Sequence, residues 1–506
     1  MSRNIRVWRF GQAPRLCQGT PGRNIKVRTL AAKTTATIAL LALGLVFSGQ
    51  SAWSYSVSGN TYTTNGSPSD VQAAVNAAPS GSTIFFTAGT YSWSNTTPVV
   101  VNKSLTLTAT PGSVQIQNML GPGSGFMMSL TSGKDGHIRV NGLNFLQIGN
   151  NSGSASSACL GIDRTDMGGP GSPGTQYTVI FTNCTFDSGG VWNYVGFAGA
   201  NGLIFSHCVF KANNGLCGIS FTCTKYMNYP GLGTGGTWNT PDTMGLGPDS
   251  TGLNVGDTAA GWCGVAGLNC TYIEDSTISN GTSGTFNGDD CSRIVVRHCT
   301  CIDTQLFSHG QDTGPAGNRH YEIYNNTMTN VNGSALGAQG WCSFRGAVAL
   351  VANNAMDVSN SGKSSVNMQC QQVARNAGPG ACQTGYPANR QCGIGWSARS
   401  SAPYGNPVVP SDGIGQVSDP IYVWGNTGAG GPGYANYVGV SNFYQDECGN
   451  GLLASNFIQQ NRDYIVGTSR PGWVPYTYPH PLVSGGGSGG GTPAPTPAAP
   501  QNLRVQ

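Results

Sequence analysis

Charged side chains are scarce in this sequence, so the few that gather between residues 272 and 345 are the first candidates for chemistry. Only 9% of the 506 positions carry Asp, Glu, Lys or Arg. One group lies in three short glycine-containing segments: Asp289 and Asp290 in FNGDDC, His309 and Asp312 in SHGQDTG, and Arg345 in WCSFRG. Carboxylates, an imidazole and a guanidinium are the groups that act on glycosidic bonds.

Two reactions fit this first group. Hydrolysis of a glycosidic bond needs a protonated carboxyl as the acid and a second carboxylate as base or nucleophile. Elimination from a uronic acid needs a base, with a cation or an arginine drawing charge from the substrate carboxylate. A non-catalytic interpretation is also open, because paired aspartates in a glycine-rich turn commonly bond their own backbone.

A metal site would be another use for the same carboxylates. Asp289, Asp290 and Asp312 could bind calcium, which takes several oxygen ligands from loops, although no EF-hand spacing is present. Zinc is disfavoured because the chain has no CxxC pair and its histidines lack ligand spacing. The metal, if any, stays unassigned, with calcium as the candidate.

A second group occupies equivalent positions of a repeated phrase. If the phrases stack, one column is Glu274, Arg297 and Tyr324, with further polar or aromatic residues in the columns beside it. Those neighbours are Tyr272 and Glu322 on one side, and Arg293 and His320 on the other. Such a strip suits a sugar chain, which needs hydrogen bonds for hydroxyls and a ring face for stacking. The alternative is an ion pair between Glu274 and Arg297 on an ordinary solvated face.

The repeated phrase determines the fold prediction. It consists of alternating apolar residues, a polar residue, then Cys, Ser or Asn, a small residue and an apolar one. Seven copies are VIFTNCTF (179–186), LIFSHCVF (203–210), TYIEDSTI (271–278), IVVRHCTC (294–301), YEIYNNTM (321–328), ALVANNAM (349–356) and YVWGNTG (422–428). Adjacent copies are 23 to 28 residues apart, and the gaps of 68 and 72 residues hold about three such periods. A period of this length predicts a solenoid whose coils bury their apolar faces on each other.

Stacking like on like then separates core from corner. Val179, Leu203, Ile294 and Tyr321 should point inward, and so should the apolar residues two positions later. These are Phe181, Phe205, Ile273, Val296, Ile323 and Val351. The corner column is Cys184, Cys208, Ser276, Cys299, Asn326, Asn354 and Asn426. We expect an amide ladder at its asparagines and buried thiols, rather than disulfides, at its cysteines.

The two ends of the chain have other compositions. A basic run followed by the 12-residue apolar stretch 36–47 predicts a signal peptide over 1–53, and hence a secreted protein, extracellular or on the cell surface. Residues 54–483 would form the coil. Ser67 precedes a short amphipathic helix, apolar at 71, 74, 75 and 78, which could cap the first turn. Residues 484–500 (SGGGSGGGTPAPTPAAP) are a linker.

The 16 cysteines include one in the signal segment, which leaves an odd number in the exported chain. Those in glycine-rich segments are candidates for disulfides that restrain long insertions. The pairs favoured are Cys217 with Cys223 and Cys263 with Cys270, with further bridges among Cys370, Cys382 and Cys392.

Longer segments resemble a known superfamily. DVQAAVNAAPSGSTIFFTAGTY (70–91) resembles the N-terminal cap of the pectin lyase-like superfamily. YEIYNNTM, DPIYVWGNT (419–427) and RDYIVGTSRPGWVPYTYPHPL (462–482) resemble a largely uncharacterised group of secreted bacterial β-helix proteins. The resemblance implies an all-β, right-handed parallel β-helix with a capping helix, and a link to polysaccharides. PAAPQNLRVQ is similar to the start of a fibronectin type III module, with 501–506 as its truncated beginning.

One catalytic signature is matched in part. GDDC with His309-Gly310 some 19 residues later resembles the polygalacturonase signature, which implies Asp289 or Asp290 as the acid and His309 as an auxiliary. The Asn-Thr-Asp-Gly and Arg-Ile-Lys parts of that signature are missing.

The expected function is therefore that of a secreted carbohydrate-active protein, a glycoside hydrolase or a polysaccharide lyase. The alternative is a non-catalytic glycan-binding or adhesion β-helix. The expected partner is a polysaccharide, bound by a monomer that is free of the membrane after signal cleavage. Nucleic acid is disfavoured because the net charge is only +4, and part of it lies in the signal segment.

Overall fold

A computed structural model gives the arrangement of the chain. It describes residues 55–94, 97–120, 127–131, 135–148, 160–163, 178–189, 195–198, 203–212, 219–222, 270–279, 285–289, 293–308, 318–331, 340–344, 347–357, 366–369, 396–398, 416–418, 420–428, 435–441, 455 and 458–483.

Three sheets contain almost all of the described strands. Sheet A is β1 (Ser56–Ser58), β2 (Thr61–Thr64), β3 (Thr83–Phe86), β6 (Thr106–Thr108), β9 (Ile138–Asn141), β12 (Val179–Thr182), β15 (Ile204–Ser206), β18 (Thr271–Glu274), β21 (Arg293–Arg297), β24 (Asn318–Tyr324), β27 (Ala347–Ala352), β32 (Ile421–Trp424) and β34 (Tyr464–Val466). Sheet B is β4 (Gly89–Trp93), β7 (Val114–Asn118), β10 (Leu143–Gln147), β13 (Thr185–Asp187), β16 (Val209–Lys211), β19 (Thr277–Ser279), β22 (Thr300–Ile302), β25 (Thr327–Thr329) and β28 (Ala355–Met356). Sheet C is β5 (Val99–Val101), β8 (Met128–Thr131), β11 (Leu160–Asp163), β14 (Val195–Ala198), β17 (Ile219–Thr222), β20 (Thr285–Asp289), β23 (Gln305–Ser308), β26 (Cys342–Phe344), β29 (Val366–Gln369) and β33 (Val438–Ser441). β30 (Trp396–Ala398) and β31 (Gln416–Ser418) form a separate antiparallel sheet of two strands.

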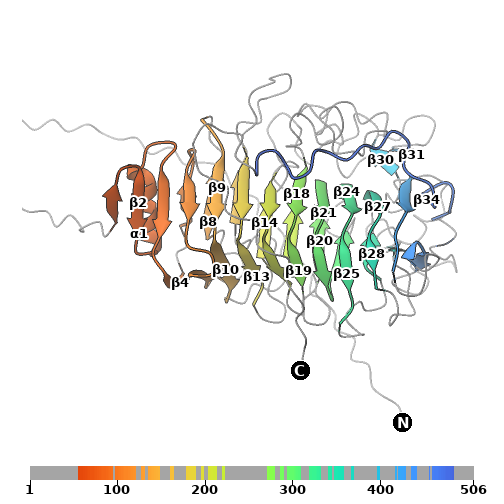
Figure 1. The fold of residues 1–506 in the computed structure, drawn as a ribbon, viewed down its shortest axis with the longest axis horizontal. Coiled ribbons are helices and arrows are strands. Elements are labelled where there is room, and N and C mark those ends of the chain that lie inside the picture. The colour runs from red at the N-terminus through yellow and green to blue at the C-terminus, as the bar shows by residue number, and fades with distance from the viewer. Residues whose placement is uncertain are drawn as a thin grey trace, which may run out of the picture. The chain divides into compact units, whose positions relative to one another are not determined.

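The order of strands along the chain defines the fold. From β3 to β29 the chain visits sheets A, B and C in turn, and each strand pairs in parallel with the strand three places later. Within the three large sheets, the described antiparallel pairing is that of β1 with β2. Figure 1 shows the resulting rows of strands, one coil after another. The predicted parallel β-helix is confirmed.

The inward columns form the core as predicted. Val179, Leu203, Ile294 and Tyr321 have no exposed surface, and the same is true two residues later at Phe181, Phe205, Ile273, Val296, Ile323 and Val351. Neighbouring coils place equal side chains on each other, so that the rings of Phe181 and Phe205 stack with centroids 4.7 Å apart. The repeat length therefore sets the packing of the core.

The corner between sheets A and B explains the polar end of each phrase. The residue before each corner position has left-handed backbone: Asn183, His207, Asp275, His298, Asn325 and Asn353 have φ between 50° and 55°, and Gly425 has 65°. Asn, Asp, His and Gly tolerate this conformation best. A Cβ on Gly425 would lie 2.2 Å from Asn353 Oδ1, so glycine also suits the space there.

The next position forms the predicted ladder. Asn326 Nδ2 donates to Asn354 Oδ1 at 3.0 Å, and Asn354 Nδ2 donates to Asn426 Oδ1 at 2.9 Å. The ladder continues to Asn436, which accepts from Asn426 Nδ2 at 3.0 Å. Each of the three amides also bonds a strand carbonyl, so these buried polar groups are satisfied.

The cysteines of the corner column are buried free thiols, as expected. Cys184, Cys208 and Cys299 are at most 2% exposed and form no disulfide. Burial raises the pKa of the Cys208 and Cys299 thiols well above the usual range. Cys270 is disulfide-bonded; Cys217, Cys223, Cys263, Cys370, Cys382 and Cys392 lie outside the described residues.

The predicted N-terminal helix is α1 (Pro68–Ala77). Ser67 is its N-cap and accepts the N–H of Asp70 at 3.4 Å, while Val71, Ala74 and Val75 are buried in the core cluster. The helix packs on β2, β3 and β5. Within the described ranges, no helix has the length and apolar character needed to cross a membrane.

The C-terminal segment, residues 470–483, is here called the strap. Arg470 Nη1 donates to Pro420 O at 3.3 Å, and Leu482 O accepts from Arg139 Nη1 at 3.1 Å. At its end, Leu482 and Val483 pack against Ile180 and Ile204. The strap therefore returns along the outer face of sheet A from β32 to β9, and Figure 1 shows it in dark blue across the green strands.

Candidate functional site

The predicted columns on sheet A have the predicted register. Glu274 pairs with Arg297 and Arg297 with Tyr324, on β18, β21 and β24. In the neighbouring column Val295 separates Tyr272 from Glu322, and in the other Arg293 pairs with His320. The side chains of Arg293 and His320 lie outside the described residues, so only their backbone register is known.

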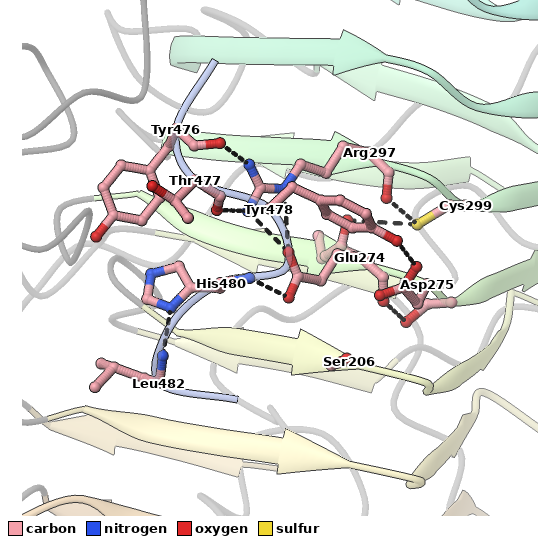
Figure 2. A network of polar contacts seen from close by, with 12 residues as sticks. Ser206, Glu274, Asp275, Arg297, Cys299, Tyr476, Thr477, Tyr478, His480 and Leu482 are labelled. Carbon is pink, nitrogen blue, oxygen red and sulfur yellow. Dashed lines mark hydrogen bonds and ion pairs between the residues drawn. The ribbon is translucent and has the colours of Figure 1, made fainter. Parts of the chain in front are cut away.

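Arg297 is the centre of this group. Its Nε and Nη2 donate to Glu274 Oε2 at 3.1 and 2.9 Å, and Nη1 donates to Tyr324 Oη at 3.0 Å. The strap supplies two more acceptors, Tyr476 O for Nη1 and Thr477 O for Nη2, both at 2.9 Å. Figure 2 shows the strap passing over the guanidinium. A guanidinium has five N–H groups, and these five bonds use all of them.

Glu274 is equally enclosed. Its Oε2 accepts both bonds from Arg297, and its Oε1 accepts the backbone N–H of His480 at 2.9 Å. Burial raises the pKa of the Glu274 carboxyl, against the opposing effects of Arg297 and the His480 N–H. The ring of Tyr272 completes the surroundings, with the guanidinium carbon 5.0 Å from its centroid.

The strap makes further contacts along the strip. Trp473 Nε1 donates to Glu322 Oε2 at 3.1 Å, and its ring lies edge-on to Tyr324 with centroids 5.2 Å apart. At the corner, Tyr478 donates to Asp275 Oδ1, and its ring stacks on His298 with centroids 3.7 Å apart. The strap is thus fixed both over the strands of sheet A and at the corner between sheets A and B.

These contacts correct one expectation. Tyr272, Glu274, Arg297 and Glu322 have no exposed surface and Tyr324 has 1%, so the strip is not open to a sugar chain while the strap lies on it. The predicted ion pair between Glu274 and Arg297 exists, but the solvated face expected around it does not. Alternation along a strand indicates which way a side chain points, and it cannot reveal a segment that returns from 180 to 206 residues later in the sequence.

The first group of candidates belongs to sheet C. Asp289 is the last residue of β20, while His309 directly follows β23 and Arg345 directly follows β26. The residues before them, Gly288, Ser308 and Phe344, are paired in register across the three strands. Gly288, Ser308 and Phe344 therefore occupy one position, at or next to the end of the strand, on three successive coils. The side chain of Asp289, together with Asp290, His309, Asp312 and Arg345, lies outside the described residues.

The spacing of the strands bears on which aspartate corresponds to Arg345. Counting eight residues back from the corner phrase aligns Arg345 with Asp290, whereas in sheet C the residue before Arg345, Phe344, is in register with Gly288, the residue before Asp289. The two counts differ because three residues separate β20 from β21 and only two separate β26 from β27.

The outer side of sheet C next to this position is buried. Cys342 and Phe344 belong to the core, so Ser343 between them points outward, in one column with Asn287 and Phe307. All three are at most 2% exposed. Within the described residues, Ser343 Oγ has no hydrogen-bond partner, which makes it a buried polar group available to a ligand or to water.

No metal centre is evident in the part of the chain that the structure describes: it holds no group of three or more His, Cys, Asp or Glu that could bind an ion. Asp290 and Asp312, two of the three candidate calcium ligands, lie outside that part, as does the side chain of Asp289. The calcium site stays a prediction.

The strap is the element of this site that the repeat could not reveal. Its sequence, RPGWVPYTYPHPLV, has four prolines and four aromatic or imidazole side chains but no strand alternation. The concentration of Trp473, Tyr476, Tyr478 and His480 immediately after the last coil was the available signal, because such side chains are commonly buried against another surface.

Comparison with known proteins adds little to this description. No protein-family model matches the chain, and no curated protein matches it. Among solved structures, the chain is similar to a PL6 family polysaccharide lyase from Pseudopedobacter saltans, with a TM-score of 0.34 and 12% identity over 81% of this chain and 92% of the other. It is also similar to a mutant of the PL6 family alginate lyase AlyGC, with a TM-score of 0.29 and 14% identity over 83% of this chain and 59% of the other. The β-helix assignment rests on the chain's own strand pairing.

Proposed function

We propose that this chain is a carbohydrate-active protein that degrades a polysaccharide, with its chemistry where the chain leaves sheet C. The observation that supports this is the common register of Gly288, Ser308 and Phe344, the residues that precede Asp289, His309 and Arg345. Adjacent parallel strands are about 4.8 Å apart, so Gly288, Ser308 and Phe344 are neighbours across the sheet. The buried, unbonded hydroxyl of Ser343 next to them is a further polar group for a substrate.

The roles follow from the chemistry of each side chain. Asp289, with Asp290, would provide the acid and the base or nucleophile of a hydrolase, with His309 as an auxiliary. In a lyase, Arg345 would instead stabilise the charge that develops on a uronate. Both reactions use the same position on the coil.

Several features of the surrounding chain belong to the same proposal. The coil would be right-handed and closed at its first turn by α1. The protein would be secreted after removal of residues 1–53, and residues 484–500 would link the coil to a fibronectin type III-like module that begins at 501.

The test is turnover on a panel of neutral and uronate polysaccharides. Hydrolysis is monitored by the release of reducing ends, and elimination by the formation of unsaturated products. Asp289→Asn and Asp290→Asn should each lower the turnover rate on the substrate that the wild type degrades. The loss should be roughly 100-fold or more at the residue that acts as acid or base. Asp187→Asn is the matched control, because Asp187 lies on sheet B beside the exposed Lys211. Turnover by neither wild type nor control on any substrate would refute the catalytic proposal.

A second candidate is non-catalytic glycan binding. It is favoured by the sheet A strip, where aromatic rings and hydrogen-bonding groups gather beneath the strap, and it requires that the strap leave the strip. Binding of a glycan without any bond cleavage would identify this function.

A further inference from the structure

The strap contacts the sheet A strip through its main chain as well as through the side chains of Trp473 and Tyr476. Arg297 donates to the carbonyl oxygens of Tyr476 and Thr477, and Glu274 accepts the N–H of His480. Farther along, Arg139 donates to the carbonyl oxygen of Leu482. The main-chain groups of the strap in these bonds are neutral acceptors and a neutral donor. Hydroxyl groups, which both donate and accept, can make the same bonds.

The charge around Arg297 favours a neutral occupant over an acidic one. Glu274 places a carboxylate against the guanidinium of Arg297, and both side chains are buried. Arg297 is already bonded twice to Glu274, so an additional carboxylate at its outer edge would face a neutralised cation and a neighbouring like charge. A uronate is therefore a poor fit, whereas a neutral sugar adds no charge.

The strip also presents aromatic rings toward the strap. Tyr272 faces Tyr476 with ring centroids 5.8 Å apart, and Tyr324 faces Trp473 at 5.2 Å. In the absence of the strap, the two tyrosines would stand on either side of the Glu274–Arg297 pair. Aromatic faces beside fixed hydrogen-bonding groups are the usual composition of a site for a polyhydroxylated ring.

The strap joins the coil through a short exposed connection. Residues 467–469 are exposed, and the described backbone on both sides of them is anchored, at β34 and at Arg470. Because the strap is tethered, its effective concentration at the strip is on the order of millimolar or higher, and a free ligand of ordinary affinity competes poorly with it. The closed protein should then show little binding at this strip.

We propose that the strap covers a binding strip for a neutral polyhydroxylated chain, and that its own main chain occupies the positions of the ligand's hydroxyl groups. The choice of a carbohydrate as the ligand rests on the proposed function, whereas its neutrality rests on the charge around Arg297. A neutral chain has no carboxylate to support elimination, so this strip pairs with hydrolysis rather than with a lyase reaction.

The experiment opens the strap after folding is complete. A protease recognition sequence inserted at 467–469 allows the purified, folded protein to be cut there, and a fluorescent peptide with the sequence of residues 470–483 then reports on the strip. The peptide should bind the cut protein, and neutral oligosaccharides should displace it at least tenfold more effectively than uronate oligosaccharides of equal length. The double variant Glu274→Leu/Arg297→Met should weaken binding of the peptide and of the sugar by roughly tenfold or more, because each loses charge-assisted hydrogen bonds. Thr300→Ala, at an exposed position of sheet B, is the matched control and should change neither.

Each outcome decides the proposal. Peptide that binds but is displaced by no neutral oligosaccharide, or is displaced better by uronates, would overturn it. So would affinities of the peptide and of the neutral oligosaccharide that are both unchanged in the Glu274→Leu/Arg297→Met variant. None of these readings requires turnover, so failure of the proposed catalysis at sheet C, measured with Asp289→Asn, remains distinguishable from failure here.

Discussion

Arg297 and Glu274 lie on adjacent strands of sheet A, bonded at 2.9 and 3.1 Å, and neither side chain has any exposed surface. The pair is stabilised because every N–H of Arg297 has an acceptor and both oxygens of Glu274 have donors. Two of those acceptors and one of those donors come from the strap. The pair therefore joins the coil to the last described segment of the chain.

Removing one member of this pair should lower the free energy of unfolding far more than removing both. Arg297→Met leaves a buried carboxylate without its cation, which should lower the free energy of unfolding by about 3–5 kcal/mol. Glu274→Leu/Arg297→Met replaces both charges by apolar groups and should recover most of that loss. Urea unfolding of the wild type, both single variants and the double variant measures the coupling; equal losses in Arg297→Met and the double variant would contradict the buried pair.

A substitution in the asparagine ladder should destabilise the fold more than a substitution at the residue beside it. Asn354→Ala removes a side chain that bonds Asn426, Ile323 O and the amides of Asn326, and should lower the free energy of unfolding by about 1–3 kcal/mol. Asn353→Gly is the matched control, since Asn353 is exposed and has left-handed backbone, which glycine adopts without strain. Thermal unfolding would compare the two. An equal or larger loss in the control would argue against the ladder.

Acid should weaken the corner of the strap through His298. Burial lowers the pKa of His298 below its ordinary value of 6.5, Arg297 acts in the same direction, and Asp275 opposes them. Between the lowered pKa and 6.5 the unfolded chain holds more protons at this residue, so stability falls as the pH falls through 6.5. Protonation of His298 should also weaken the contact with Tyr478, whose ring stacks on the imidazole.

Glu274 contributes with the opposite sign. Its pKa is raised above 4.5 in the fold, so the folded chain holds more protons in that window and stability rises as the pH falls. The comparison that isolates His298 is therefore wild type against His298→Asn, which keeps a residue suited to left-handed backbone. Melting temperatures between about pH 7.5 and 5.5 should fall more in the wild type than in the variant. Parallel curves would contradict the assignment to His298.

The buried thiols should be inert in the folded protein. Burial raises the pKa of Cys208 and Cys299 well above 9.0, so neither forms the reactive thiolate near pH 8. Alkylation of native protein, followed by mass spectrometry of the individual peptides, should find both unmodified, and alkylation in denaturant should label both. Modification of Cys299 in the native protein at the rate seen in denaturant would show that the corner column is open.

The sequence predicts the part of this molecule that repeats. Equivalent positions of the phrase stack on one another, so the sequence alone predicts Phe181 and Phe205 in the core and Asn326 and Asn354 in a ladder. The register of Glu274, Arg297 and Tyr324 followed from the same alignment. Each of these depends on contacts between neighbouring coils, which the shared register of the phrase determines although adjacent copies are 23 to 28 residues apart.

The repeat predicts neither the position of the strap nor the lengths of the turns between sheets C and A. Glu274 and His480 meet across 206 residues of sequence, and no periodic pattern connects them. Equal counts from Asp290 and from Arg345 to the corner phrase assume a constant turn between sheets C and A, whereas the β20–β21 and β26–β27 turns differ by one residue. Left-handed backbone before each corner, by contrast, could have been inferred from the run of Asn, His and Asp at Asn183, His207 and Asp275.

The most direct test of this account is hydrogen–deuterium exchange of the strap, and above all of the His480 amide that Glu274 accepts. In the wild type, the amides of residues 473–483 that bond sheet A should be protected, and Glu274→Leu/Arg297→Met should release them while protection of β18 and β21 persists. Strap amides that exchange at the rate of a free peptide in the wild type, or protection that is the same in the double variant, would contradict the claim that the buried pair holds the strap on the coil.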